Sequence, residues 1–213
     1  MAKLQSSFKN MALSLTCIAL VAAGALAGVY MLTMAPIEAA MKAKQEAAIM
    51  QVLPQVEGLQ VAEAQVFNGL TYYKAYVGEE WVGTAVEATT EGNVNMPFGG
   101  TFRLMVGFDS VGNVVNYVVL EQAETPGLGA LMVSWFCNAD KPGQNIIGKN
   151  PATTNFAVSK DGGDVDAITA STITSRAFLE VVVKAYNAIA QQPMPIEATS
   201  GATQLTTEEG GQQ

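Results

Sequence analysis

A run of small and hydroxyl-bearing residues near the C-terminal end has the residue types of a phosphate-binding site. It reads DAITASTITS from Asp166 to Ser175. The run leads directly into an amphipathic stretch, Thr174–Ala190, in which apolar residues recur at helical spacing. Because a helix N-terminus presents free N–H groups and the positive end of the helix dipole, this junction is typical of an anion site. Arg176, in the expected first turn, would add a cation.

The same run also has a purely structural interpretation. Thr172 or Thr174 would cap the helix, and the neighbouring hydroxyls would satisfy the other N–H groups of its first turn. A second segment, Glu124-Thr125-Pro126-Gly127-Leu128-Gly129, is equally ordinary by itself. It predicts a Pro-Gly turn followed by a short helix within Pro126–Phe136. Generic physical chemistry leaves both interpretations of the hydroxyl run open.

The two segments together resemble the FMN-binding domain family that is found in RnfG and NqrC. The first matches the flavinylation pattern Asp-x-x-Ser/Thr-Gly-Ala-Thr of that family, with Ala170 in place of the usual Gly and Ser171 in place of the usual Ala. The second matches the ETPGLG loop, which lies close to the flavin in the family. The resemblance covers roughly residues 30–192.

This resemblance implies a covalent FMN, joined through its phosphate as an ester of Thr172 by a flavin transferase. No catalytic residue and no metal ligand is expected. Asp166 is expected to assist flavinylation or the geometry of the motif. The other residues that the resemblance assigns to the cofactor are Thr169, Ser171, Thr174, Ser175, Glu124, Thr125, Gly127 and Leu128.

The implied function is electron transfer by a membrane-anchored redox subunit that is not catalytic alone. The resemblance favours a subunit of an ion-translocating ferredoxin:NAD oxidoreductase (Rnf) complex, with the other membrane and peripheral subunits as partners. A subunit like NqrC, in a Na⁺-translocating NADH:quinone reductase, is the nearest alternative. A non-redox, membrane-anchored binding or assembly module is an alternative of a different class.

A competing copy of the motif lies in the C-terminal tail. Glu197-Ala198-Thr199-Ser200-Gly201-Ala202-Thr203 contains the more standard Ser-Gly-Ala-Thr. It has Glu where the motif requires Asp, and no amphipathic stretch follows it. We therefore expect Thr172, and not Thr203, to carry the flavin.

The N-terminal region predicts a single membrane anchor. Residues 10–37 contain no charged side chain, and residues 11–34 are long enough as a helix, about 36 Å, to cross a bilayer. A cleaved signal peptide is less consistent, because the apolar run continues past the small residues Ala25 and Ala27. Lysines flank both ends of the span, so charge alone does not fix its orientation. We expect a short cytoplasmic leader, an inner-membrane span and a periplasmic domain.

Composition excludes several functions for the rest of the chain. The sequence has no His, so a His general base, a Ser-His-Asp triad and a Cys/His zinc site are absent. All 19 acidic residues follow Ile37, which argues against nucleic acid as a partner. Three further residues are expected to be structural. Cys137 is expected to be a buried thiol beside aromatic residues, and Trp81 and Trp135 are expected to be core side chains and not flavin-stacking ones.

The predicted fold class is α+β, with one transmembrane helix followed by an antiparallel sheet and packed helices. Pro36 permits a break or kink, after which helix continues over Ile37–Leu53. The predicted strands are Gln65–Val77, Trp81–Ala88, Gly100–Phe108 and Val114–Leu120, separated by Gly-containing turns. The expected organisation is a leader (1–10), the span (11–34), an FMN-binding domain (35–192) and a disordered tail (193–213).

Overall fold

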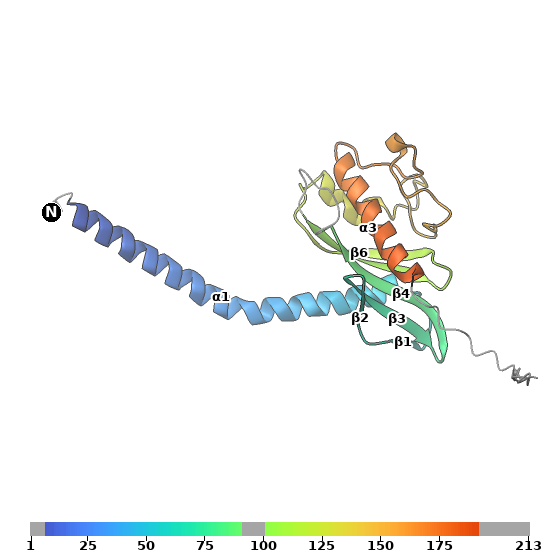
Figure 1. The fold of residues 1–213 in the computed structure, drawn as a ribbon, viewed down its shortest axis with the longest axis horizontal. Helices are drawn as coiled ribbons and strands as arrows, with labels where there is room; N and C mark the ends of the chain where they lie inside the picture. The colour runs from blue at the N-terminus through green and yellow to red at the C-terminus, as the bar shows by residue number, and fades with distance from the viewer. Residues whose placement is uncertain (1–6, 91–100, 192–213) are drawn as a thin grey trace, which may run out of the picture.

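A long N-terminal helix leads into a sheet-based domain (Figure 1). The computed structural model describes residues 7–90 and 101–191. Helix α1 (Phe8–Val52) is continuous over 45 residues and is long and apolar enough to cross a membrane. It contains all of the apolar run at residues 11–34, whose side chains are exposed.

Pro36 lies inside α1 and does not end it. Proline has no N–H group, so the carbonyl of the residue four positions earlier loses its helical partner, and helices bend at such positions. Figure 1 shows α1 bending between its projecting part and the part that reaches the domain. The helix then continues to Val52, with Leu53 as its C-cap, just before Pro54. Of the break or kink that Pro36 permits, the helix shows no break, and the prediction of helix after Pro36 is confirmed.

The domain is built on a six-stranded antiparallel sheet in the order β1-β3-β4-β5-β6, with β2 also paired to β3. The predicted α+β class, with an antiparallel sheet and packed helices, is confirmed. The predicted pairing of the last two strands as a hairpin is also confirmed. The strands are β1 (Leu59–Val61), β2 (Gln65–Phe67), β3 (Leu70–Val77), β4 (Glu80–Thr89), β5 (Phe102–Asp109) and β6 (Val114–Gln122).

The prediction of one strand over Gln65–Val77 is wrong. The segment forms two strands, β2 and β3, which pair antiparallel across a two-residue turn. That turn is Asn68-Gly69, and both residues have positive φ, 51° and 76°. Asn-Gly is the sequence most suited to such a turn, because both residues tolerate the left-handed region. The strand-forming residues on both sides of Asn68-Gly69 concealed this turn in the sequence.

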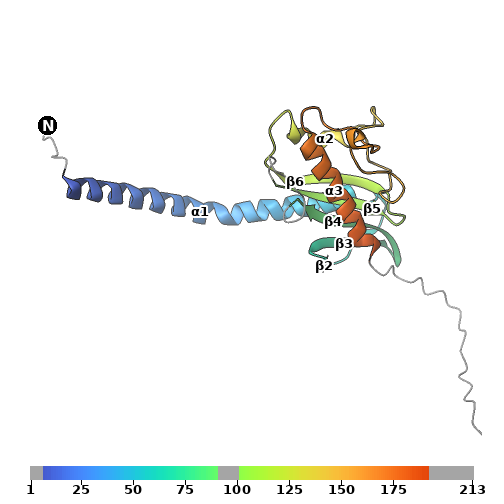
Figure 2. The same cartoon turned by 45° about the horizontal axis from the view of Figure 1, so that its top comes forward.

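Helices pack on both faces of the sheet (Figure 2). Helix α3 (Thr172–Ala190) crosses one face and encloses the larger core with it. Phe178 of α3 lies at the centre of this core, stacked on Phe136 at 4.3 Å and edge-on to Tyr117 at 4.9 Å. The last turns of α1 cover the other face, where Ile49, Val52 and Leu53 are buried. The central strands are therefore apolar on both sides.

Strand β6 runs antiparallel to the end of α1. Asn116, early in β6, donates to the carbonyl of Gln51 at 3.1 Å, whereas Leu120, late in β6, accepts from Lys44. The strand therefore returns toward the part of α1 that precedes the domain. The segment that begins at Glu124 follows directly at this end of the sheet.

The remaining elements are short and lie between β6 and α3. A 3₁₀ turn, η1 (Gly129–Leu131), leads into α2 (Met132–Trp135), which together form the short helical segment predicted there. A second 3₁₀ turn is η2 (Ser159–Asp161). The Gly-containing turn predicted between Ala88 and Gly100, at Glu91-Gly92-Asn93, and the predicted tail at 193–213 lie outside the described residues.

Candidate functional site

The two segments singled out by the sequence form one pocket at the N-terminus of α3. Its volume is about 400 Å³. Glu124 lies fifty residues before Thr174, and the two side chains meet in a hydrogen bond of 3.1 Å, donated by the Thr174 hydroxyl. The residues that line the pocket are Glu124, Thr125, Leu128, Gly129, Ala170, Ser171, Thr172, Ile173 and Thr174.

Glu124 supplies the negative charge of the pocket. Its Oε2 accepts from Thr174, whereas its Oε1 is buried and has no hydrogen-bond partner among the described residues. A buried carboxylate oxygen without a donor is costly, so this atom is an acceptor available to a bound molecule. Gly129 lies directly behind the carboxylate, and a Cβ at this position would overlap it. Sequence reasoning missed Gly129 and chose Gly127, although both glycines stand in the same motif.

The N-terminus of α3 opens into this pocket. The helix begins at Thr172, its N-cap is Ser171, and the cap side chain makes no hydrogen bond to the first turn. The first helical bond found is donated by the Ser175 N–H to the Ser171 carbonyl, which leaves the earlier N–H groups without a helical acceptor. The expectation that Thr172 or Thr174 caps the helix is wrong, because both lie inside it.

Ser175 orders the loop that leads into the helix. Its hydroxyl donates to the Ser171 carbonyl and accepts from the N–H of Ile168, both at 2.9 Å, and the residue is fully buried. Ala170, in the middle of this loop, has a φ of 61°, a left-handed conformation that non-glycine residues rarely adopt. This is the position at which the resembled family has Gly. The loop is thus a tight structure that fixes where Thr172 begins the helix.

Asp166 lies outside the residues that line the pocket. Its Oδ1 accepts from the Ser159 hydroxyl at 2.7 Å, and its carbonyl accepts from the Trp135 indole at 2.9 Å. Its carboxylate also packs against Gly143, where a Cβ would overlap it. Asp166 therefore joins three separate segments next to the motif. Thr169, Ser175 and Gly127 are likewise not among the lining residues.

Arg176 does not supply the expected cation. Its guanidinium binds both carboxylate oxygens of Asp161, at 2.6 and 2.8 Å. This hydrogen-bonded pairing lowers the pKa of Asp161 from its ordinary value and raises the pKa of Arg176. No Lys or Arg is among the described residues that line the pocket. The positive charge available to an anion in this pocket is therefore the partial charge at the N-terminus of α3.

Trp81 and Trp135, which were expected not to stack on a flavin, both lie outside the pocket, and Cys137 is not buried. The Trp81 indole donates to the carbonyl of Gly83 at 2.8 Å, and the Trp135 indole is bonded to Asp166. Neither tryptophan lines the pocket. Cys137 is exposed, so the expectation of a buried thiol is wrong. It follows the short helix α2 on the solvent side.

The residues of the pocket fit FMN. A pocket of this volume is in the range of small-molecule sites. The open N–H groups at the start of α3 suit a phosphate, and the unpartnered oxygen of Glu124 suits a hydroxyl or N–H donor. Thr172 offers a half-buried hydroxyl at the same helix end.

Comparison with known families identifies two matching regions. Residues 98–187 match the family described as the FMN-binding domain. Residues 1–52 match the family described as the RnfG N-terminal region. The second region is almost coextensive with α1, which ends at Val52.

Similar proteins include several that are named as the G subunit of an ion-translocating oxidoreductase complex. The chain is 34% identical to the one from Yersinia pestis, over 67% of this chain and 71% of the relative. It is 32% identical to that of Haemophilus influenzae (strain PittEE), over 71% and 75% of the two chains. It is 36% identical to that of Escherichia coli (strain K12), over 67% and 71%.

Proposed function

The chain belongs to the family of G subunits of ion-translocating oxidoreductase complexes, and from that premise we propose that it is an Rnf-type electron-transfer subunit that carries FMN on Thr172. The observation that best supports Thr172 as the attachment site is that the two motif segments line one pocket. Thr172 lines it at the open end of α3, opposite the loop that contains Glu124. Bound FMN would supply the electron chemistry.

Different residues of the pocket would bind different parts of FMN. The free N–H groups at the start of α3 would bind the phosphate, aided by the helix dipole. Glu124 would accept a hydrogen bond through its unpartnered Oε1, while Thr174 holds the other oxygen in place. Thr125 and Leu128 would contact the flavin from the loop.

A covalent bond from the Thr172 hydroxyl to the FMN phosphate would retain the cofactor permanently. A domain outside the cytoplasm cannot easily recapture a lost flavin, and a tether keeps its local concentration constant. Asp166 would assist the attachment of FMN or keep the motif in its conformation. Its hydrogen bonds to Ser159 and Trp135 fix the chain six residues before Thr172. A flavin transferase would make the bond: the Thr172 oxygen would displace the group that leaves the phosphorus of the transferase's flavin donor, and the hydroxyl proton would be lost.

The proposed setting is a membrane complex. Helix α1 would anchor the chain in the inner membrane, with residues 1–10 in the cytoplasm and the FMN-binding domain in the periplasm. Domain limits of 35–192 and a tail from 193 are part of this proposal. The partners would be the other membrane and peripheral subunits of the Rnf complex. The chain would serve as a redox subunit and would not be catalytic alone.

Intact mass after co-expression with a flavin transferase tests the attachment site. We expect the full chain to gain the mass of FMN less one water, and Thr172→Ala to lose this adduct completely. Thr203→Ala, in the second copy of the motif outside the described residues, is the matched control and should keep it.

Two results would contradict the proposal. Loss of the adduct in Thr203→Ala, but not in Thr172→Ala, would move the site to the tail. Absence of an adduct on the unaltered chain, while the transferase modifies another substrate in the same cells, would favour the non-redox binding module.

A further inference from the structure

A second pocket lies where α1 reaches the domain, apart from the candidate flavin site. Its volume is about 350 Å³. One wall is a face of α1 and the other is formed by the adjoining ends of β5 and β6. We call it the junction groove. The residues that line it are Ile37, Ala40, Met41, Lys44, Gln45, Arg103, Leu120 and Glu121.

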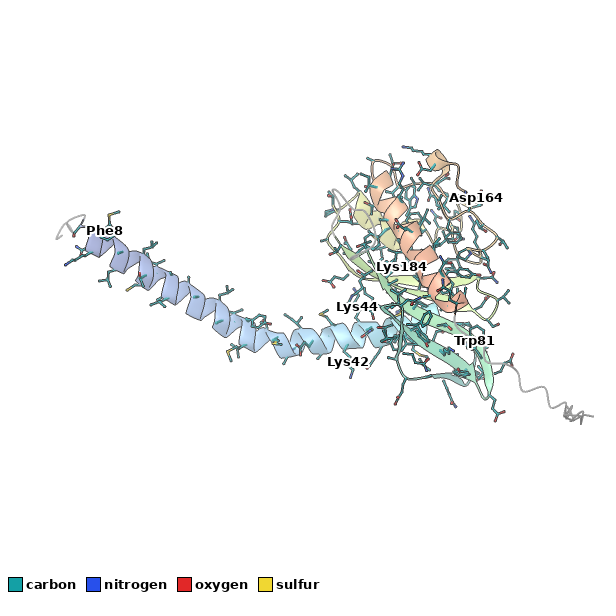
Figure 3. The ribbon with its side chains drawn as sticks, in the orientation of Figure 1. Phe8, Lys42, Lys44, Trp81, Asp164 and Lys184 are labelled. Carbon is teal, nitrogen blue, oxygen red and sulfur yellow. The ribbon has the colours of Figure 1, made fainter. Side chains whose placement is uncertain are left out.

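The junction groove combines an apolar floor with two cations. Ile37 and Met41 follow one another on α1 at a spacing of four residues, and they remain 54% and 47% exposed. The Lys44 ammonium donates to the carbonyl of Leu120, and so stands at the sheet end of the groove. Figure 3 shows Lys44 on the stretch of α1 that meets the domain. A ligand for this groove therefore needs an apolar part and an anionic part.

Arg103 has a hydrogen-bonding group that the described part of the chain leaves without a partner. One terminal nitrogen binds Glu87 at 3.0 Å and the other is 3.6 Å from Glu121. The Nε–H is buried and has no partner among the described residues. A guanidinium N–H without an acceptor carries a desolvation cost, and a phosphate oxygen is the acceptor that guanidinium groups match best.

Glu87 and Glu121 both pair with the positive charge of Arg103, but they differ in burial and in their other contacts. The Glu87 side chain is only 14% exposed, and its second oxygen accepts from Gln45 at 2.6 Å. The Glu121 side chain is 66% exposed, and its one ion pair among the described residues is the long contact to Arg103. Glu87 is therefore a fixed part of the sheet, whereas Glu121 stands at the rim, where it can meet a second charge of a ligand.

The position of the groove along α1 points to the source of the ligand. The apolar run ends at Met34, and the groove begins three residues later, at Ile37. At 1.5 Å per residue, Ile37 and Lys44 lie about 5 and 15 Å beyond that end. The headgroup layer of a bilayer is roughly 5–8 Å thick on each side. The Lys44 ammonium is bonded to the Leu120 carbonyl, so a lipid phosphate that contacts it must rise out of this layer along the groove.

We propose that the junction groove binds one glycerophospholipid of the surrounding bilayer. Its phosphate would accept from the Arg103 Nε–H and from Lys44, and its glycerol and upper acyl chain would lie along Ile37 and Met41. Glu121 at the rim favours a headgroup that carries an ammonium group. The proposal requires that α1 crosses the membrane, and it is independent of the flavin.

Native mass spectrometry of the full chain, in non-ionic micelles to which phosphatidylethanolamine is added, tests this site. We expect one tightly bound phospholipid per chain. Lys44→Gln should weaken its binding about tenfold, the loss of one charged contact. Lys42→Gln is the matched control, because Lys42 is exposed on α1, does not line the groove and should have no effect.

Two further variants separate the parts of the proposal. Arg103→Lys keeps the charge but removes the Nε donor and should also weaken binding, with its thermal unfolding in the same micelles reporting whether the sheet remains folded. Glu121→Gln should reduce the preference for phosphatidylethanolamine over phosphatidylglycerol. Equal binding by Lys42→Gln and Lys44→Gln would overturn the lipid site. Displacement of the lipid by millimolar inorganic phosphate would also overturn it, because the site would then be one for soluble anions.

Discussion

Ala170 is the residue at which the loop before α3 carries strain. Its φ of 61° places it in the left-handed region, which costs a residue with a Cβ about 1–2 kcal/mol. The resembled family has Gly at this position, which occupies the region freely. The loop nevertheless keeps its shape, because Ser175 bonds to both Ile168 and Ser171.

We therefore predict that Ala170→Gly stabilises the domain slightly. The relief of strain exceeds the extra chain entropy that glycine gives to the unfolded state, so the expected gain is about 0.5–1 kcal/mol. Chemical denaturation of the full chain in micelles measures it.

Ala170→Val is the matching control and should destabilise the domain, because β-branched residues are disfavoured at positive φ. A Gly variant that is less stable than the unaltered chain would mean that the loop conformation is not strained in solution.

Single residues were hardest to assign where their partner is distant in sequence. The sequence placed Arg176 correctly in the first turn of α3, but its Asp161 partner is fifteen residues away, in η2. Cys137 has aromatic neighbours on one side in the sequence, which suggested burial, yet it falls just after α2 on the exposed side. Neither outcome is encoded in the local pattern of residue types.

Among the elements, α1 and β5 approach each other closely. Gly107 of β5 lies directly against the backbone carbonyl of Val52, and a Cβ at this glycine would overlap it. The approach lets the last turns of α1 bury Ile49, Val52 and Leu53 against the sheet.

We predict that Gly107→Ala destabilises the domain by about 2–3 kcal/mol, because the helix end must move away from the strand. Thermal unfolding in micelles and limited proteolysis near Pro54 measure the change. Gly28→Ala, in the projecting part of α1 where a Cβ meets no other atom, is the control and should leave both measurements unchanged. An equally stable Gly107→Ala chain would contradict the close packing described above.

At the element scale the sequence was most informative where periodicity was strong. It predicted α3, the β5–β6 hairpin and the helix after Pro36 to within two residues at most ends. It failed at Asn68-Gly69, because the alternating pattern on both sides concealed a two-residue turn. It also gave no sign of β1, which is only three residues long and is defined by its pairing with β3.

In the molecule as a whole, the two parts of α1 have different surroundings. Its first part is exposed and apolar, and its last turns complete the second core of the domain. The resemblance allowed the two motif segments to be brought together from sequence alone. The docking of α1 could not be predicted, because helical periodicity does not reveal which sheet face a helix will cover.

We predict that a chain starting at Ile37 folds as a soluble domain, whereas one starting at Pro54 does not. Removal of Ile49, Val52 and Leu53 exposes the sheet face beneath them, at a cost of roughly 5 kcal/mol or more. That is comparable to the whole stability of a typical domain. Circular dichroism and size exclusion of the two truncated chains distinguish these outcomes. A folded, monomeric chain starting at Pro54 would show that α1 is only an anchor.

The bend at Pro36 has a mechanical consequence, because no loop separates the apolar part of α1 from the domain. Sixteen helical residues follow Pro36 up to the end of the helix at Val52, a rigid arm of about 24 Å. A change of about 10° in the bend would therefore sweep the sheet, and any cofactor it carries, through roughly 4 Å. Electron donors and acceptors that this domain serves must lie on the narrow arc that such an arm can reach.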